Sequence, residues 1–377
     1  MRSLQVVLVS SVGVLALGVA IVAFAPELTS KIASTSQFAM FRAAVNIHHQ
    51  LYGTNSSTRP SVETSFMSKI LKNSPSVDAE RVHKPSVFRK HLEETMISLC
   101  AYPSHLNITR TMHSVPVGNG ASIPMLWLDF PASTPKPSKH ITIVYFHGGG
   151  FIEGSIKAYE GVVANLVNEL QLIGNSVGGS LHYSVVIPEY RLAPENPLPT
   201  GIEDCLEAYK YILKEGNDEN TILFMGDSAG GHLTISVALE AIEKGVPTPK
   251  ALVAFSPWTD LTNSNPSITT NADNDPVLNP AMINKFSDWS APSMEAKEKY
   301  SLLNYDARKF ENVFPPLLIQ VGSHEMLLDD AIFMSKLTGD LEIYENQGHD
   351  FNLFVGWIPE AEDALQSVNK FIKHHLL

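Results

Sequence analysis

The sequence predicts an α/β protein built around a mostly parallel, doubly wound sheet with a helical cap. Short, nearly continuous apolar runs recur along the chain, and such runs are typical of strands buried on both faces. Stretches with the apolar spacing of helices separate these runs, and strands that alternate with helices favour parallel crossover connections. The chain has 377 residues, of which 44% are apolar, which is enough for one large core and a smaller cap.

The expected elements follow in chain order. Residues 108–117 and 123–130 are predicted to pair as strands around Gly118-Asn119-Gly120, a hairpin-type turn. The buried strands are expected at 141–146, 184–187, 221–225, 251–255, 317–321 and 341–344. The helices between and after them are expected at 158–172, 201–215, 230–244, 327–337 and 361–374.

Three regions are expected along the chain. Residues 1–30 are predicted to be an N-terminal membrane anchor, residues 31–106 a helical N-terminal or cap region, and residues 107–377 the main α/β domain. Within that domain, residues 258–314 contain several breaks rich in Asn, Pro and Ser. This interval is too long for a simple connection, so it is predicted to be a cap-like insertion over the carboxyl edge of the sheet.

The anchor prediction depends on residues 4–25, which carry no charge. A stretch of about 20 apolar residues can span a bilayer as a helix. The alternative is a cleaved signal peptide, because Ala23-Phe24-Ala25 has the small-x-small pattern, although Pro26 would then follow the cut. We expect a single-pass anchor in the endoplasmic reticulum membrane with a lumenal body; the alternative is secretion. The sequons at Asn55 and Asn107 are candidate glycosylation sites compatible with a lumenal body.

Charge and metal-ligand spacing exclude several classes of protein. The formal net charge of −12 argues against a nucleic-acid partner, which would need a basic surface. The two cysteines, Cys100 and Cys205, form no disulfide framework or zinc motif, and none of the fourteen histidines has metal-ligand spacing. No metal and no cofactor are expected.

A candidate nucleophile lies between a predicted strand and a predicted helix. Gly226-Asp227-Ser228-Ala229-Gly230 has the Gly-x-Ser-x-Gly pattern of the sharp turn that exposes a nucleophilic serine in α/β-hydrolases. Glycines on both sides remove Cβ clashes in such a turn, and the following helix points its positive end at the serine. Ser228 is therefore the predicted nucleophile, and an ordinary strand–helix turn is the alternative.

A glycine-rich loop follows the predicted strand 141–146. In His147-Gly148-Gly149-Gly150-Phe151 the glycines would let backbone N–H groups approach a tetrahedral oxyanion closely. The amides of Gly148, Gly149 and Ala229 are the predicted donors. No P-loop lysine or dinucleotide-binding glycine spacing is present, which disfavours a phosphate-binding loop.

The remaining members of a catalytic triad are expected after Ser228. His349 follows the last predicted strand, where a general base would stand at the carboxyl edge of the sheet. Glu325 follows the penultimate strand and is the predicted acid that orients His349. Asp329 and Asp330 are the alternatives, although carboxylates in the first turns of a helix more often serve that helix.

Four ordered motifs resemble the hormone-sensitive-lipase family of α/β-hydrolases. They are His147 to Phe151, Tyr190-Arg191-Leu192-Ala193-Pro194-Glu195 with Pro199 and Asp204, Gly226 to Gly231, and Gly348-His349-Asp350-Phe351. The resemblance covers residues 107–377 and implies esterase or lipase activity on uncharged esters, no cofactor and a mostly helical cap. The family usually has Asp where this sequence has Glu325. The anchor and the general sequence texture are also similar, more distantly, to fungal steryl acetyl hydrolases.

The function expected is hydrolysis of uncharged, lipid-like carboxylic esters with a short acyl group, acetylated sterols being one such class. Ser228, His349 and Glu325 would act as the triad through an acyl-enzyme. Two alternatives stay open at this point. One is a binding protein on a hydrolase fold that has lost activity, and the other is amide or formamide hydrolysis by the same triad.

Overall fold

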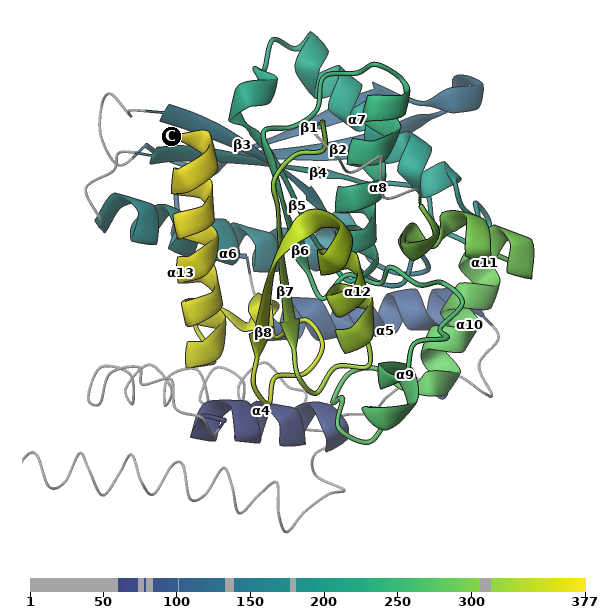
Figure 1. Ribbon diagram of the computed structural model, residues 1–377. Helices are drawn as coiled ribbons and strands as arrows, with labels where there is room; N and C mark the ends of the chain where they lie inside the picture. The colour runs from purple at the N-terminus through teal and green to yellow at the C-terminus, as the bar shows by residue number, and fades with distance from the viewer. Residues whose placement is uncertain are drawn as a thin grey trace, which may run out of the picture.

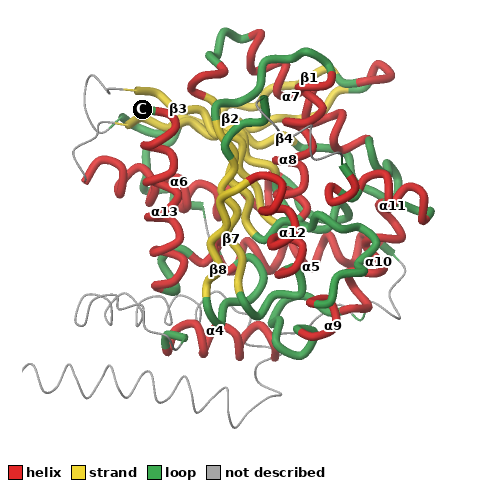
Figure 2. The backbone as a smooth tube through the Cα atoms, in the orientation of Figure 1, coloured by secondary structure: helices red, strands yellow, loops and turns green. Residues whose placement is uncertain are grey.

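The computed structural model describes residues 60–73, 78, 84–100, 102–132, 139–176, 181–305 and 313–377. Its centre is a single eight-stranded sheet in the order β1-β2-β4-β3-β5-β6-β7-β8 (Figures 1 and 2). The strands are β1 (Thr109–Pro116), β2 (Ser122–Asp129), β3 (Lys139–Phe146), β4 (Leu181–Pro188), β5 (Ile222–Asp227), β6 (Ala251–Phe255), β7 (Leu317–Gly322) and β8 (Gly339–Tyr344). The β1–β2 and β2–β4 pairs are antiparallel and the other neighbours are parallel, as the sequence predicted.

Helices cover both faces of the sheet, which confirms the doubly wound prediction. One face is covered by α6 (Ile156–Ser176) and α13 (Pro359–Leu376), and the other by α7 (Thr200–Lys214), α8 (Ala229–Glu243) and α12 (Leu328–Thr338) (Figure 1). Each strand and helix predicted from residue 107 onward overlaps an element of the structure.

The central strands appear in the sequence as continuous apolar runs because both of their faces are buried. In β3, Ile143 and Tyr145 pack with α6 and α13, whereas Val144 and Phe146 pack with α7 and α8. All four side chains are fully buried. The core therefore lies in two layers, one on each side of the sheet.

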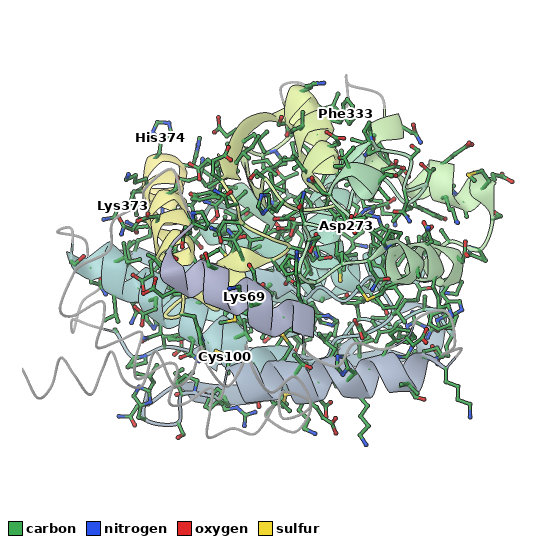
Figure 3. The ribbon with its side chains drawn as sticks, turned by 90° about the horizontal axis from the view of Figure 1, so that it is seen from below. Lys69, Cys100, Asp273, Phe333, Lys373 and His374 are labelled. Atoms are coloured by element: carbon green, nitrogen blue, oxygen red, sulfur yellow. The ribbon has the colours of Figure 1, made fainter. Side chains whose placement is uncertain are left out.

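In the described part of the chain, five further α-helices lie outside these layers. They are α4 (Val62–Asn73), α5 (Pro85–Leu99), α9 (Ser267–Thr270), α10 (Pro280–Ser290) and α11 (Met294–Tyr300). The first two fall in the predicted region 31–106 and the last three in the predicted insertion 258–314. Figure 3 shows the side of the molecule that α4 and α5 cross, where Lys72 of α4 donates a hydrogen bond to the carbonyl oxygen of Asp273 (2.7 Å).

The inner face of α5 differs from the sequence expectation. The apolar spacing of Val87, His91, Leu92 and Thr95 alone would place these residues on one buried face of α5, but Val87 is exposed, whereas Phe88 and Met96 are buried. The buried face is therefore shifted by one residue along the helix. The reason is tertiary: Phe88 packs edge-on against Phe286 and Trp289 of α10.

The predicted anchor, residues 4–25, and the sequon at Asn55 lie outside the described residues. Within the described ranges, no helix is both long and apolar enough to cross a bilayer. The sequon at Asn107 is exposed and stands just before β1. Arg191 and Asp204, which belong to one of the four family motifs, form an ion pair with two side-chain hydrogen bonds of 2.7 and 2.9 Å.

Strand register brings the predicted site residues to one edge of the sheet. Phe146 of β3 pairs with Gly226 of β5, so the glycine loop and Ser228 leave the sheet side by side. Gly322 of β7 pairs with Tyr344 of β8, so the loops that carry Glu325 and His349 also leave together. Parallel strands end at the same edge, and this is why residues more than 200 positions apart meet there.

Candidate active site

Ser228 occupies the sharp turn between β5 and α8. Its backbone has φ 53° and ψ −117°, a conformation rare for a residue with a side chain and characteristic of strained functional turns. A Cβ at Gly226 would overlap the carbonyl oxygen of Gly230, and a Cβ at Gly230 would overlap that of Phe146. The two flanking glycines are therefore required by close backbone packing, and Ser228 stands at the N-terminal end of α8 with 7% of its surface exposed.

His349 and Glu325 are in contact and almost completely buried. Nδ1 of His349 lies 3.2 Å from Oε2 of Glu325. The other carboxylate oxygen, Oε1, accepts hydrogen bonds from Ser256 Oγ (2.7 Å) and the Gly322 amide (2.5 Å). These two donors hold the Glu325 carboxylate so that its free oxygen faces the imidazole.

The alternative acids lie elsewhere. Asp329 accepts a hydrogen bond from the Ser267 amide (2.8 Å) at the start of α9. Asp330 is fully buried and accepts hydrogen bonds from the amides of Thr259 (2.7 Å) and Asp260 (2.8 Å). Both carboxylates hold the insertion to α12, and Glu325 is the one of the three that hydrogen-bonds His349.

The second ring nitrogen of His349 has a partner that the sequence did not predict. Nε2 lies 3.1 Å from Oδ2 of Asp350, the next residue. Burial opposes a charge on the imidazole, but Asp350 and the hydrogen bond to Glu325 outweigh burial and raise the pKa of His349 to about 10. The structure therefore contains the hydrogen bond between Glu325 and His349. Among the described residues it shows no hydrogen bond between His349 and Ser228, although both side chains line one cavity.

The glycine loop reaches the cavity beside Ser228 through Gly149, which adopts φ +106°, and through Gly150. Ala229 is the first residue of α8. Gly148 packs against Asp227, where an added Cβ would overlap the carboxylate, and it is not one of the residues that line the cavity. Gly148, Gly149 and Ala229 stay the predicted oxyanion donors, and Gly150 is a further candidate that the sequence did not single out.

Asp227 forms a buried polar cluster behind the glycine loop that the sequence analysis also missed. Its two oxygens accept hydrogen bonds from Tyr145 (2.7 Å) and Tyr159 (2.9 Å). Burial raises the pKa of Asp227 to about 6, against the lowering effect of the two tyrosines. The sequence offered one clue to Asp227 and Asp350, because each adjoins a predicted catalytic residue. The neighbouring sequence does not indicate the direction in which either carboxylate points.

The cavity beside Ser228 has a volume of about 160 Å³ and a mainly apolar wall. Helices α4, α5 and α10 contribute part of that wall, through Leu71, Leu92, Met96, Met282, Ile283 and Phe286. Trp258 also lines the cavity and is 1% exposed. Ser228 and His349 therefore face a mainly apolar chamber bordered by these helices.

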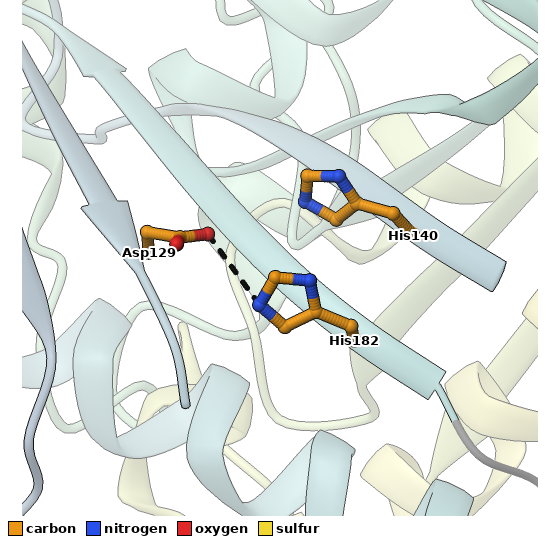
Figure 4. Close-up of side chains that lie close together, drawn as sticks. All are labelled: Asp129, His140 and His182. Atoms are coloured by element: carbon orange, nitrogen blue, oxygen red, sulfur yellow. Dashed lines mark ion pairs between the residues drawn. The ribbon is translucent and has the colours of Figure 1, made fainter. Parts of the chain in front are cut away.

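Three potential metal ligands lie close together at the edge of the sheet opposite the candidate active site. Potential ligand atoms of Asp129, His140 and His182 lie within 4.8 Å of one another (Figure 4). Nε2 of His182, however, lies 2.6 Å from the carbonyl oxygen of Phe130, so that nitrogen carries a proton and donates it. Nε2 of His140 is hydrogen-bonded to Ser184 Oγ (2.7 Å). The cluster is satisfied within the protein. It lies at the end of β2 and near the starts of β3 and β4, and the glycine loop follows the other end of β3.

This fold, with a serine in a strained strand–helix turn and a buried His–Glu pair at the same edge, defines a hydrolase of the α/β class. A family model described as alpha/beta hydrolase fold matches residues 143–352, more than half of the chain. The chain belongs to the alpha/beta hydrolase fold family.

Three similar proteins are named as esterases or as an acetyl-hydrolase. An esterase of Acinetobacter venetianus is 29% identical over 244 residues, covering 61% of this chain and 73% of that protein. An acetyl-hydrolase of Streptomyces hygroscopicus is 28% identical over 239 residues, covering 62% of this chain and 75% of that protein. The crystal structure of an esterase from the bacterial hormone-sensitive lipase family has a TM-score of 0.69 at 25% identity and covers 85% of this chain and 100% of that chain. The chain is accordingly a carboxylic-ester hydrolase, and the predicted family resemblance is confirmed.

Proposed function

We propose that this esterase cleaves uncharged, lipid-like esters with a short acyl group, and that Ser228, His349 and Glu325 carry the reaction. The observation that supports the substrate class most directly is the cavity beside Ser228. An engineered apolar cavity of about 150 Å³ binds benzene, so a chamber of similar size has room for an acetyl or butyryl group but not for a long acyl chain. Acetylated sterols fall within this class, and one relative is named an acetyl-hydrolase.

In the proposed mechanism, Ser228 Oγ attacks the acyl carbon and His349 takes its proton. His349 then returns that proton to the departing alcohol, and water releases the acyl group from Ser228 by the reverse roles. Glu325 orients the imidazole, and backbone amides of the glycine loop and Ala229 stabilise the oxyanion. For this step Nε2 must exchange Asp350 for Ser228, while the Nδ1 contact with Glu325 is kept.

A series of p-nitrophenyl esters from acetate to palmitate tests the substrate class. We expect kcat/KM to be highest for acetate to butyrate and to fall steeply for longer acyl groups, because a cavity of about 160 Å³ has little room for them. Matched p-nitroanilides should react far more slowly. Preference for palmitate would refute the short-acyl proposal, and faster cleavage of the anilides would favour amide hydrolysis.

We also propose that residues 4–25 anchor the enzyme in the endoplasmic reticulum membrane with the catalytic domain in the lumen. The support is the uncharged apolar sequence itself, which is long enough to span a bilayer. An anchor would keep the cavity near a membrane, where lipid-like esters are concentrated. Glycosylation at Asn55 and Asn107 would follow from that topology.

Fractionation of microsomes tests the anchor and its orientation. We expect the full chain to stay in the pellet after carbonate extraction, and the part after residue 31 to resist protease added outside sealed vesicles. Asn55→Gln and Asn107→Gln should each remove one endoglycosidase-sensitive shift in mobility. Release by carbonate would indicate a cleaved signal peptide or a peripheral protein, and digestion in sealed vesicles would reverse the topology.

A further inference from the structure

Glu153 is a buried acid in the wall of the catalytic cavity that the proposed mechanism does not use. It lies between the glycine loop and the start of α6, and only 9% of its surface is exposed. Its Cγ would lie 3.0 Å from a Cβ at Gly149, so the side chain starts next to the candidate oxyanion site. It lines the same cavity as Ser228 and His349.

Within the described part of the chain, the Glu153 carboxyl has no hydrogen-bond partner. The nearby cation, Arg89, is occupied by other groups. Its Nε donates to the carbonyl oxygen of Ile152 (2.7 Å), and its terminal nitrogens bind Glu195 (2.6 Å) and the carbonyl oxygen of Ala193 (2.9 Å). Burial raises the pKa of Glu153 to about 8, with Arg89 only partly opposing it, so the carboxyl is mostly protonated at neutral pH.

The surroundings make an unpartnered acid costly. Most of the cavity wall is apolar, and a polar group removed from water without a hydrogen bond costs on the order of 1–3 kcal/mol. Buried polar groups are nearly always hydrogen-bonded in native proteins. Because the protein supplies no partner here, the carboxyl bonds to whatever fills the cavity, which is water in the free enzyme and the substrate once it displaces that water. An apolar substrate would leave the carboxyl without a hydrogen bond, whereas a substrate with an oxygen group at this place would not.

We propose that Glu153 is a specificity-determining residue that hydrogen-bonds an uncharged oxygen group, a hydroxyl or a carbonyl, on the otherwise apolar substrate. A protonated carboxyl donates to either group through its O–H and can also accept from a hydroxyl. A cationic substrate group is disfavoured, because the acid is neutral in this setting. The inference rests on the proposed function and narrows the substrate class to short-acyl esters whose apolar body carries an oxygen group in addition to the ester.

The test compares two acetate esters. One is the acetate of a plain linear alcohol, and the other is the acetate of the same alcohol with an added hydroxyl group, whose distance from the ester is varied. We expect the wild-type enzyme to prefer one hydroxylated isomer by about tenfold or more in kcat/KM, the effect of one buried hydrogen bond. Glu153→Leu should abolish this preference, chiefly by speeding cleavage of the plain acetate and slowing that of the hydroxylated one. Glu153→Gln keeps a donor and an acceptor and should retain most of the preference.

Glu207→Leu is the matched control, because Glu207 lies on α7, pairs with Lys210 and does not line the cavity, and we expect it to leave the preference unchanged. Binding of the two free alcohols, measured by calorimetry, gives the same comparison without turnover. If the wild-type enzyme bound the hydroxylated alcohol more tightly than the plain one but cleaved neither acetate, the proposed function would be wrong and the subsite would stand. Equal effects of Glu153→Leu on both compounds, in turnover and in binding, would overturn the subsite.

Discussion

Ser228→Ala is expected to abolish ester hydrolysis while leaving the fold intact. Loss of the nucleophile in such triads removes about 10⁶ of the rate. The turn should persist, because its glycines and the hydrogen bond from the Ser228 amide to the carbonyl oxygen of Phe255 (2.9 Å) do not involve the hydroxyl. The measurements are kcat for p-nitrophenyl acetate, labelling by a fluorophosphonate probe and the thermal melting temperature.

Ser236→Ala is the matched control for this prediction. Ser236 lies two turns along α8, is also buried, and donates a hydrogen bond from its hydroxyl to the carbonyl oxygen of Leu233 (3.5 Å). It should keep wild-type turnover and labelling. If Ser228→Ala retained more than a few per cent of the activity, another residue would be the nucleophile. If the wild-type chain resisted the probe, the proposed serine mechanism would fail.

Glu325→Gln is expected to reduce kcat by about 10⁴ with little change in stability, as in triads whose histidine is held in the wrong tautomer. The structure gives a specific reason. Oε1 accepts hydrogen bonds from Ser256 and the Gly322 amide, so the carbonyl oxygen of a glutamine must face those donors. Its NH₂ group then faces Nδ1 of His349, which must accept instead of donate. Steady-state kinetics and thermal melting check the two parts of this prediction.

Asp329→Asn is the control for the acid assignment. The Asp329 carboxylate accepts the Ser267 amide at the start of α9 and makes no hydrogen bond to His349. Removing its charge should cost about 1 kcal/mol of stability, typical of a lost cap, and leave kcat nearly unchanged. The opposite pattern, in which Asp329→Asn is inactive and Glu325→Gln is active, would transfer the role of acid to Asp329.

The sequence by itself determined the sheet, its helices and the order of the candidate catalytic residues. Strands such as 141–146 and 317–321 are buried on both faces, so their apolar runs identify them without any tertiary information. The turn at Ser228 is equally local, because its strained backbone needs glycines at fixed offsets. Parallel strands end at one edge, so the loops after them, including those with Glu325 and His349, were expected to converge.

Only the tertiary structure decided how side chains point within that edge. Asp350 turns to Nε2 of His349, Asp227 binds two tyrosine hydroxyls, and Glu153 has no hydrogen-bond partner among the described residues of an apolar wall. The last two depend on segments distant in the chain: Tyr145 and Tyr159 hold Asp227, and α5 and α10 border the cavity beside Glu153. Periodicity and motif spacing record local backbone geometry and burial. The partners of a buried polar group depend on which distant loops pack against it, and no local pattern encodes that.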